Sequence, residues 1–333
     1  FALQKISAIM VPVNFRLAPR EVSHVLRDAA PVLFIWQEQF ADVIAQLDAD
    51  VRDCRQHRFD GQDSLLTRMY NENASAAAVI QESDFDTPCM ILYTSGTTGA
   101  PKGAVITHGM LFWNSINTSM RLNLVQSDVT LTFAPFFHTG GWNVLTTPFL
   151  HRGGHVVLLK KFDPDQVLRL CDSRQVSILF GVPTMMDMLA EAPGFGASTL
   201  DSVRYAIVGG EPMPITLIRT WQEKGVPIRQ GYGLTEFGPN VFSLNEEDAE
   251  RKIGSIGFPN FYVETRVVDE RNRDCADGVV GELLLRGPVC MPGYYNNPGA
   301  TKAAFLDGWL RTGDLVRRDE EGCFYVVDRQ TDM

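Results

Sequence analysis

The chain has 333 residues, 45% of them hydrophobic and 21% charged, a composition typical of a globular protein with a sizeable core divided into two or more domains. Its formal net charge of -10 and its lack of a basic stretch argue against a nucleic-acid-binding surface, because phosphate backbones favour Lys- and Arg-rich patches. No apolar run approaches the ~20 residues that span a bilayer, no signal peptide is visible, and the six cysteines form no CxxC pair, which together predict a cytoplasmic protein with reduced thiols.

Residues 1–130 are predicted to form a first α/β unit. The unit starts in an amphipathic helix that lacks an N-cap, and a polar stretch at 48–64 and an Ala/Ser-rich linker at 73–78 interrupt its middle. The chain therefore opens inside a predicted helix, and it closes directly after an apolar strand and a charged turn. We expect both ends to be incomplete.

A buried strand at 89–92 leads into the most informative stretch of this unit, residues 93–103, which read Tyr-Thr-Ser-Gly-Thr-Thr-Gly-Ala-Pro-Lys-Gly. Glycines allow backbone N–H groups to approach an anion, and hydroxyls and an ammonium add further donors. The stretch is not a common P-loop, because Lys102 is followed by Gly103 and β-prone residues rather than by Ser or Thr and a helix. Such clusters are often plain polar turns, but the buried strand before it and the lysine at its end favour a strand-flanked phosphate loop.

Residues 131–245 are predicted to form a second α/β unit. Apolar strands are expected at 156–159, 176–180, 203–208 and 227–230, and helices are expected after Asp163-Pro164, Pro183 and Pro214. This alternation predicts right-handed crossovers and a parallel sheet with helices on both faces. Because ligands bind at the carboxyl ends of such strands, the glycine-rich segments 209–211 and 231–233 should line one crevice.

Residues 246–333 are predicted to be β-rich, with strands at 263–269, 280–286 and 323–327. This pattern indicates a small barrel or a distorted sheet. The predicted fold class is therefore α/β, with two doubly wound α/β subdomains followed by a small distorted β-barrel.

Five segments in chain order resemble the signatures of the adenylate-forming superfamily, which includes acyl- and aryl-CoA synthetases, adenylation domains of peptide synthetases and beetle luciferases. They are residues 93–103, 136–142, 230–236, 281–288, and 308–314 with its continuation 325–329. The resemblance implies the large N-terminal domain of the AMP-dependent synthetase and ligase family. In that family a mobile C-terminal domain, absent here, follows a hinge at the position of Thr331, where Asp or Lys is more usual.

The resemblance implies ATP and Mg²⁺ as cofactors and coenzyme A as a co-substrate. The β- and γ-phosphates would be held by Thr94, Ser95, Gly96, Thr97, Thr98, Gly99 and Lys102. Thr235 would reach the α-phosphate, and Glu236 would bind Mg²⁺, a hard cation that prefers carboxylate and phosphate oxygens. A Thr-Glu pair alone also fits a helix start, but this one follows a glycine-rich strand end.

The nucleoside needs a flat apolar surface and an acceptor for two hydroxyls. Tyr232 offers an aromatic face for adenine, and the Asp314 carboxylate would accept from both ribose hydroxyls, with Arg329 as a further donor. The other predicted nucleotide-binding residues are Gly209, Gly210, Glu211, Gln230, Gly231 and Gly233.

The acid is expected beside the 136–142 segment and two strand ends. The predicted acyl-binding residues are His138, Thr139, Gly140, Gly141, Trp142, Val208 and Gly233. We assign His138 to substrate positioning, with a packed core histidine as the alternative. Peptide-synthetase domains carry an Asp in this segment to pair with an amino group, and the absence of one predicts an uncharged acyl or aryl acid, with fatty-acyl-CoA synthetases as the closer resemblance.

The predicted function is that of an ATP-dependent carboxylic acid:CoA ligase, which forms an acyl-adenylate and then a thioester. Lys102, Thr235, Glu236 and His138 are its predicted catalytic residues. Because the family's last catalytic lysine lies in the C-terminal domain, residues 1–333 alone are expected to bind nucleotide but turn over slowly. The alternatives are an adenylation domain that loads a carrier protein, a luciferase-like oxygenase and a non-catalytic nucleotide-binding relative. A homodimer is one expectation for the assembly.

Overall fold

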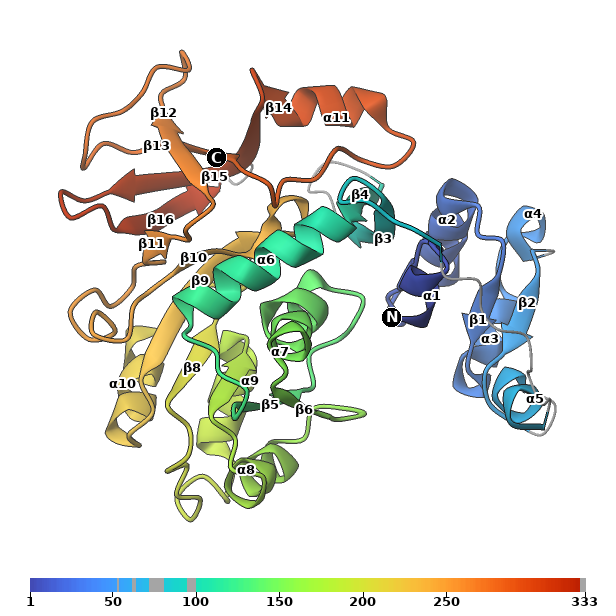
Figure 1. Cartoon of the computed structure of the whole chain (residues 1–333), viewed down its shortest axis with the longest axis horizontal. Coiled ribbons are helices and arrows are strands. Elements are labelled where there is room, and N and C mark those ends of the chain that lie inside the picture. The colour runs from blue at the N-terminus through green and yellow to red at the C-terminus, as the bar shows by residue number, and fades with distance from the viewer. Residues whose placement is uncertain (53, 62–63, 72–80, 95–99, 330–333) are drawn as a thin grey trace.

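The computed structural model describes residues 1–52, 54–61, 64–71, 81–94 and 100–329. Several predictions fall outside this part, namely the linker at 73–78, the loop residues Ser95, Gly96, Thr97, Thr98 and Gly99, and the hinge position Thr331. The described residues form a mixed α/β architecture, as the alternation of strands and helices predicted (Figure 1).

The N-terminal part is a small unit at one end of the molecule (Figure 1). Its strands β1 (Phe34–Trp36) and β2 (Gln56–Arg58) pair in parallel, and helix α2 (Pro19–Ala29) starts with proline at its first position. Its other elements are α1 (Ala2–Lys5), η1 (Glu38–Phe40), α3 (Ala41–Ala45), α4 (Ala49–Arg52) and α5 (Leu65–Asn71). A core of its own holds this unit together, formed by Val22, Leu26, Leu47 and Val51.

A hairpin follows, formed by β3 (Pro88–Thr94) and β4 (Lys102–Thr107). The two strands are antiparallel, and Thr94 pairs with Lys102 at the end that carries the predicted phosphate loop. The strand-flanked loop is therefore confirmed. Helix α6 (His108–Arg121) begins directly after β4, where the Thr107 hydroxyl accepts a hydrogen bond from the Met110 N–H at 3.2 Å.

The central sheet contains the predicted parallel strands. Strands β7 (Ile178–Gly181), β8 (Tyr205–Val208) and β9 (Ile228–Leu234) are parallel, and β10 (Gly238–Ser243) and β11 (Phe258–Pro259) extend the sheet in antiparallel pairing. The parallel pair β5 (Val129–Thr132) and β6 (His155–Leu158) lies beside β7, since the Ser177 N–H donates to the Val129 carbonyl at 2.9 Å. The predicted boundary at residue 130 falls within β5.

Helices α8 (Pro164–Ser173), α9 (Pro183–Glu191) and α10 (Ile215–Glu223) connect these strands. The predicted cap of α8 is confirmed, because Asp163 accepts from the Gln166 N–H at 2.9 Å and Pro164 occupies the first position. The apolar faces of the helices pack against the parallel strands in one core that contains Leu189, Val208 and Trp221.

The C-terminal part is a curled antiparallel sheet, which matches the expected barrel-like region (Figure 1). Its strands are β12 (Glu264–Val268), β13 (Gly281–Arg286), β14 (Phe305–Leu306), β15 (Trp309–Arg318) and β16 (Phe324–Arg329), with α11 (Pro298–Ala304) before β14. A single core joins this sheet to the hairpin and to β10, through residues such as Met90, Val241 and Leu283. This shared core brings three distant parts of the sequence together.

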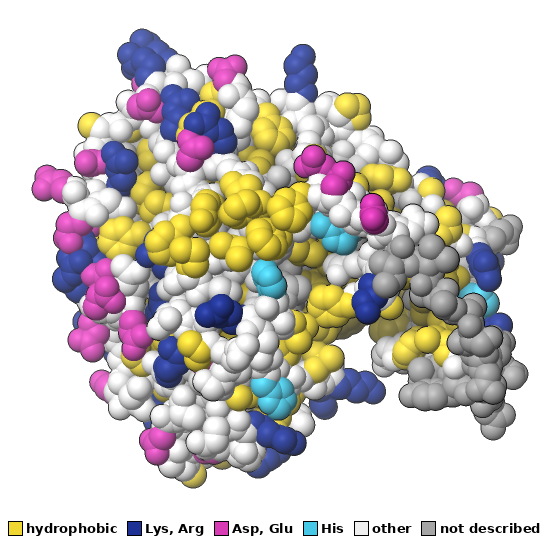
Figure 2. All heavy atoms as spheres, in the orientation of Figure 1, with side chains coloured by type: hydrophobic (Ala, Val, Ile, Leu, Met, Phe, Trp, Pro, Cys, Tyr) yellow, Lys and Arg dark blue, Asp and Glu magenta, His cyan; other side chains and the backbone are white. Residues whose placement is uncertain are grey.

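Apolar side chains gather in a band over α6 on the face shown in Figure 2. Aromatic rings on and beside this helix pack together, with centroids 5.1 Å apart for Phe85 and Phe112 and 4.9 Å apart for Trp113 and Tyr262. Among the helices that the structure describes, none combines the length and the apolar content needed to cross a membrane.

Replacement of Trp221 by alanine should destabilise the fold by about 3–5 kcal/mol, the usual cost of a cavity left by a large aromatic side chain. Trp221 is 0% exposed, and its indole N–H donates to the Met186 carbonyl at 3.2 Å. Urea denaturation measures the change, with Met188→Ala, at an exposed position of α9, as the control expected to stay within ~0.5 kcal/mol. Equal effects of the two substitutions would contradict this view of the core.

Candidate functional site

Tyr232 and Asp314 come from different sheets and contact each other directly. Tyr232 lies on β9 and Asp314 on β15, and the Tyr232 hydroxyl donates to Asp314 Oδ2 at 2.5 Å. Asp314 is only 3% exposed, and a buried carboxylate of this kind requires hydrogen-bond partners. The predicted adenine platform and the predicted ribose acceptor are therefore adjacent.

The backbone around Asp314 is fixed by both neighbouring strands. Asp314 pairs in register with Arg329 on β16, as the two predicted ribose-site residues require; the Arg329 side chain lies outside the described part. On the other side, the buried Glu282 of β13 accepts from the Arg311 guanidinium and from the Gly313 N–H, the latter at 3.3 Å. Our sequence analysis placed Glu282 in the family-like segment 281–288 but gave it no role, although a carboxylate in an otherwise apolar strand was a usable signal.

The glycine-rich segment 209–211 lies beside the end of β9, as predicted. Gln230 braces it, because its amide donates to the Glu211 carbonyl at 3.1 Å and accepts from the Met213 N–H at 3.3 Å. A Cβ at Gly209 would lie 3.2 Å from the Gly231 carbonyl oxygen, and Gly210 has a φ of +89°. The segment is thus held at the strand end by close backbone approach.

Glu236 and Lys102 both contact the side chain of Tyr294. The short helix η3 (Thr235–Phe237) follows β9 and presents Glu236, whose Oε1 accepts from the Tyr294 hydroxyl at 2.8 Å. Lys102 Nζ lies 5.3 Å from the centroid of the Tyr294 ring. Burial and the Glu236 carboxylate raise the pKa of Tyr294, so its hydroxyl is a proton donor at neutral pH. Our sequence analysis did not single out Tyr294.

Helix α2 braces the outer side of the hairpin. The Tyr93 hydroxyl donates to Asp28 Oδ2 at 2.6 Å, and His24 Nε2 lies 3.2 Å from the Pro101 carbonyl oxygen. Across the hairpin, the Thr94 hydroxyl donates to the Lys102 carbonyl at 3.4 Å. The strand ends that carry the predicted phosphate loop are therefore held by α2 and by a bond across the hairpin.

The 136–142 segment leads into a π-helical turn, η2 (Gly140–Val144), a feature frequent at functional sites. Trp142 folds back on Phe136, with its indole N–H donating to the Phe136 carbonyl at 2.5 Å. A Cβ at Gly141 would lie 2.5 Å from the Pro135 carbonyl oxygen, so glycine is required there. Thr139 accepts from the Asn143 amide at 3.2 Å, which ties the start of the turn to its end.

His138 is an exposed residue whose ring lies against Phe137, with centroids 4.5 Å apart. Partial removal of the ring from water, together with the positive charge of Arg16, lowers the pKa of His138 below its usual value. The imidazole is consequently neutral at pH 7, which suits the predicted positioning role.

The remaining predicted acyl-binding residues lie at strand ends. Val208, at the end of β8, is 0% exposed and packs in the core of the central sheet. Gly233 lies where β9 approaches β10, and a Cβ there would lie 2.2 Å from the Pro239 carbonyl. Their contact with an acid stays a prediction.

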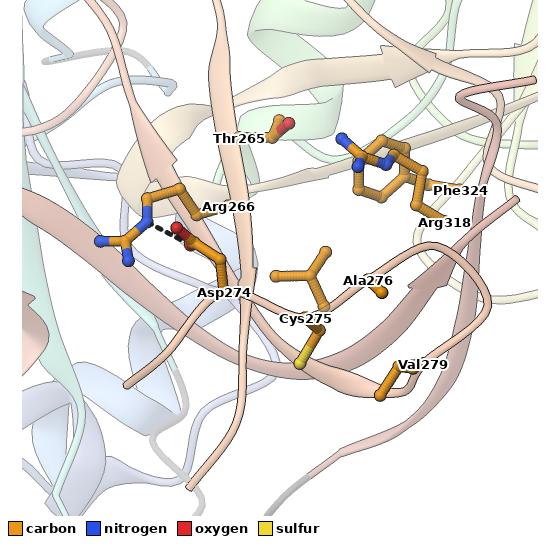
Figure 3. Close-up of a pocket in the computed structure, with 9 residues that line it drawn as sticks. Thr265, Arg266, Asp274, Cys275, Ala276, Val279, Arg318 and Phe324 are labelled. Carbon is orange, nitrogen blue, oxygen red and sulfur yellow. Dashed lines mark hydrogen bonds and ion pairs between the residues drawn. The ribbon is translucent and has the colours of Figure 1, made fainter. Parts of the chain in front are cut away.

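A cavity of about 330 Å³ opens at the far end of the curled sheet (Figure 3). It is lined by Thr265, Arg266, Val267, Asp274, Cys275, Ala276, Val279, Arg318 and Phe324. Both of its arginines are ion-paired, Arg266 with Asp274 at 2.7 Å and Arg318 with Asp277 at 2.6 Å. Arg318 pairs with Phe324 at one end of the β15–β16 pairing, and Asp314 pairs with Arg329 at the other end, so this cavity is separate from Tyr232 and Asp314.

The chain is similar to one protein family and to several curated proteins. Residues 1–295 match the AMP-binding enzyme family. The whole chain is 34% identical to a feruloyl-CoA synthase of Amycolatopsis sp and 36% identical to an indoleacetate–CoA ligase of Aromatoleum aromaticum, in each case over 66% of the relative's length. The chain thus spans about two thirds of these curated relatives.

Solved structures show the same fold. The N-terminal domain of FACL13 from Mycobacterium tuberculosis matches with a TM-score of 0.90 and 33% identity, over 98% of this chain and 81% of that one. ATP-bound MatB from Rhodopseudomonas palustris matches with a TM-score of 0.89 and 31% identity, over 99% of this chain and 65% of that one.

Substitution of Gly233 by alanine should lower the free energy of unfolding by about 1–3 kcal/mol, because the added methyl group collides with the Pro239 backbone. Gly196→Ala is the matched control, since nothing lies within 4 Å of a Cβ at that position. Chemical denaturation measures both variants. A Gly233→Ala protein as stable as the control would contradict the close approach of β9 and β10.

The lowered pKa of His138 predicts a pH dependence of stability. The folded chain favours the neutral imidazole, so the contribution is fully present above the unfolded pKa of ~6.5 and is lost as the pH falls toward the lower folded pKa. His138→Gln should therefore lose less stability than the wild type between about pH 7 and pH 5. Thermal melts across this range test it, and a steeper loss in the variant would be the contrary result.

Proposed function

Because this chain belongs to the AMP-binding enzyme family, we propose that it activates a carboxylic acid with ATP to an acyl-adenylate and passes the acyl group to coenzyme A. The observation that carries the proposal is the hydrogen bond between Tyr232 and Asp314. It joins the residue suited to adenine with the residue suited to ribose, across two sheets. The relatives named as CoA ligases support the same reaction class.

The first half-reaction is an in-line displacement. The carboxylate oxygen of the acid attacks the α-phosphorus of ATP, and the bond to the bridging oxygen breaks as pyrophosphate leaves with its electron pair. Catalysis of such a step consists mainly of positioning and charge neutralisation. Lys102, at the end of the hairpin, supplies a positive charge for the phosphates, and Thr235 supplies a hydroxyl beside Glu236.

The second half-reaction transfers the acyl group. The thiolate of coenzyme A attacks the acyl carbonyl carbon, and AMP leaves with the electrons of the carbon–oxygen bond. The proton that the thiol loses in forming the thiolate passes to solvent.

The donor set at Glu236 fits Mg²⁺. Mg²⁺ is usually held by one or two carboxylates together with substrate phosphates. Glu236 supplies one carboxylate and Thr235 a neighbouring oxygen, and no group of three or more His, Cys, Asp or Glu residues suited to a metal occurs among the described residues. When bound, the ion would neutralise phosphate charge.

The proposed substrate is an acid with an uncharged acyl or aryl tail. The 136–142 segment supplies aromatic side chains and a neutral imidazole and contains no carboxylate to pair with an amino group. Feruloyl and indoleacetate groups, named for two relatives, are aromatic acyl groups of this kind. We place the reaction in the cytoplasm, and the homodimer stays a prediction.

Replacement of Glu236 by glutamine should lower acid-dependent exchange of pyrophosphate into ATP about 100-fold, the typical cost of one lost electrostatic contact to the reacting phosphates. The exposed Glu250→Gln is the control and should keep wild-type exchange. The exchange assay uses the natural full-length protein. Undiminished exchange in Glu236→Gln would contradict the metal assignment.

Two assays separate the competing functions. Mass spectrometry of the adenylates formed from short, medium, long and aromatic acids should show an uncharged acid as the preferred substrate. Amino-acid-dependent exchange with loading of a carrier protein would instead favour the adenylation-domain alternative.

A further inference from the structure

A segment after β13, residues 288–297, runs beside β4, the hairpin strand that carries Lys102. The Val105 N–H donates to the Gly293 carbonyl at 3.1 Å, and the Tyr295 N–H donates to the Gly103 carbonyl at 2.7 Å. Between these bonds, Tyr294 forms a β-bridge with Ala104. The segment is therefore an added strand-like edge on β4, in a fixed register.

The same segment is also bonded to the backbone of η3. The Met291 N–H donates to the Glu236 carbonyl at 2.8 Å, and the Met291 side chain is buried in the core shared by the hairpin and the curled sheet. Backbone hydrogen bonds of this short stretch thus fix Glu236 relative to β4.

The backbone of Tyr294 is held tightly by α11. Its N–H donates to the Thr301 hydroxyl at 2.9 Å, and the Thr301 hydroxyl donates to the Asn297 carbonyl at 2.9 Å. A Cβ at Gly293 would lie 2.6 Å from the Thr301 methyl carbon, and Gly293 has a φ of +152°, so only glycine fits before the tyrosine. Asn297 in turn caps α11 by accepting from the Ala300 N–H at 2.9 Å.

The hydroxyl and the ring of Tyr294 contact two different residues. Its hydroxyl donates to Glu236 Oε1 at 2.8 Å, while its ring lies 5.3 Å from Lys102 Nζ, within the range of a cation–π contact. Lys102 and Glu236 carry opposite charges and would attract each other if they could meet. Among the ion pairs of the described residues, none joins them.

We propose that Tyr294 is a positioning residue that keeps Lys102 and Glu236 apart and oriented, so that both charges stay available for a nucleotide phosphate and its cation. This inference rests on the proposed function, because it assumes that the two residues bind those groups. In this proposal the hydroxyl orients the carboxylate, and the ring, whose centroid lies 5.3 Å from Lys102 Nζ, holds the ammonium by a cation–π contact in place of an ion pair with Glu236.

Two substitutions separate the two roles. Tyr294→Phe keeps the ring and removes the hydroxyl, so the Mn²⁺ concentration for half-maximal binding to the ATP-loaded chain should rise about 10-fold, as for other residues that orient a metal ligand. Affinity for ATP in EDTA should stay unchanged. Tyr294→Ala removes the ring as well, so Lys102 should pair with Glu236 and affinity for ATP in EDTA should fall about fivefold.

A double variant tests the ion-pair step directly. Adding Glu236→Gln to Tyr294→Ala removes the partner of Lys102 and should restore ATP affinity in EDTA to near the wild-type value. Calorimetry measures ATP binding and proton-relaxation titration measures Mn²⁺ binding, so neither readout depends on turnover. Tyr295→Phe, at the adjacent position, is the matched control, and thermal melts verify that each variant is folded.

The outcomes distinguish this proposal from the proposed function. Failure of the wild-type chain to bind ATP, or a Glu236→Gln chain that binds Mn²⁺ as the wild type does, would overturn both. Loss of Mn²⁺ binding in Glu236→Gln with no change in Tyr294→Phe would overturn the orienting role alone. If Tyr294→Ala lowers the affinity for ATP in EDTA and the added Glu236→Gln substitution does not restore it, the proposed separation of the two charges is overturned.

Discussion

The hydrogen bond between Tyr232 and Asp314 joins β9 of the central sheet to β15 of the curled sheet, beside the apolar core that the two sheets share. Asp314 is 3% exposed, and a buried carboxylate is stable only when hydrogen-bonded partners compensate for its lost hydration. The partner on the central sheet is a phenol at the end of β9, where the glycine-rich segment 209–211 also lies. This bond gives the junction of the two sheets one defined geometry, and it places the residue suited to adenine beside the residue suited to ribose.

A second junction sets the position of the charged groups. The hairpin carries Lys102, η3 carries Glu236, and segment 288–297 bonds to the backbone of both. Because all three elements share one apolar core, the spacing between the lysine and the carboxylate is a property of packing rather than of sequence distance. The two junctions bring together residues from the hairpin, η3, β9 and β15, and the proposed function takes them as one site, in which local donors rather than net charge would bind an anionic nucleotide.

Local patterns predicted much of this arrangement, and tertiary register decided the rest. The parallel strands β7 to β9 and the cap at Asp163 were predictable because buried strands and helix starts leave short-range signals. Resemblance to known motifs brought Tyr232, Asp314 and Glu236 into one hypothesis. Tyr294 was not predicted, because its contact with Glu236 depends on the register between β4 and segment 288–297. No local sequence pattern encodes that register. Gln230 likewise has partners that no local pattern encodes, since it braces the loop at the neighbouring strand end, and its expected contact with the nucleotide stays a prediction.

A crystal structure of the chain with a non-hydrolysable acyl-adenylate mimic tests the central claim most directly. The account predicts that adenine stacks beside Tyr232, that the ribose hydroxyls donate to Asp314, and that the phosphate lies between Thr235 and the Lys102 end of the hairpin. A well-ordered mimic bound elsewhere, such as in the cavity of the curled sheet, with Tyr232 and Asp314 still bonded to each other and not in contact with it, would contradict the account.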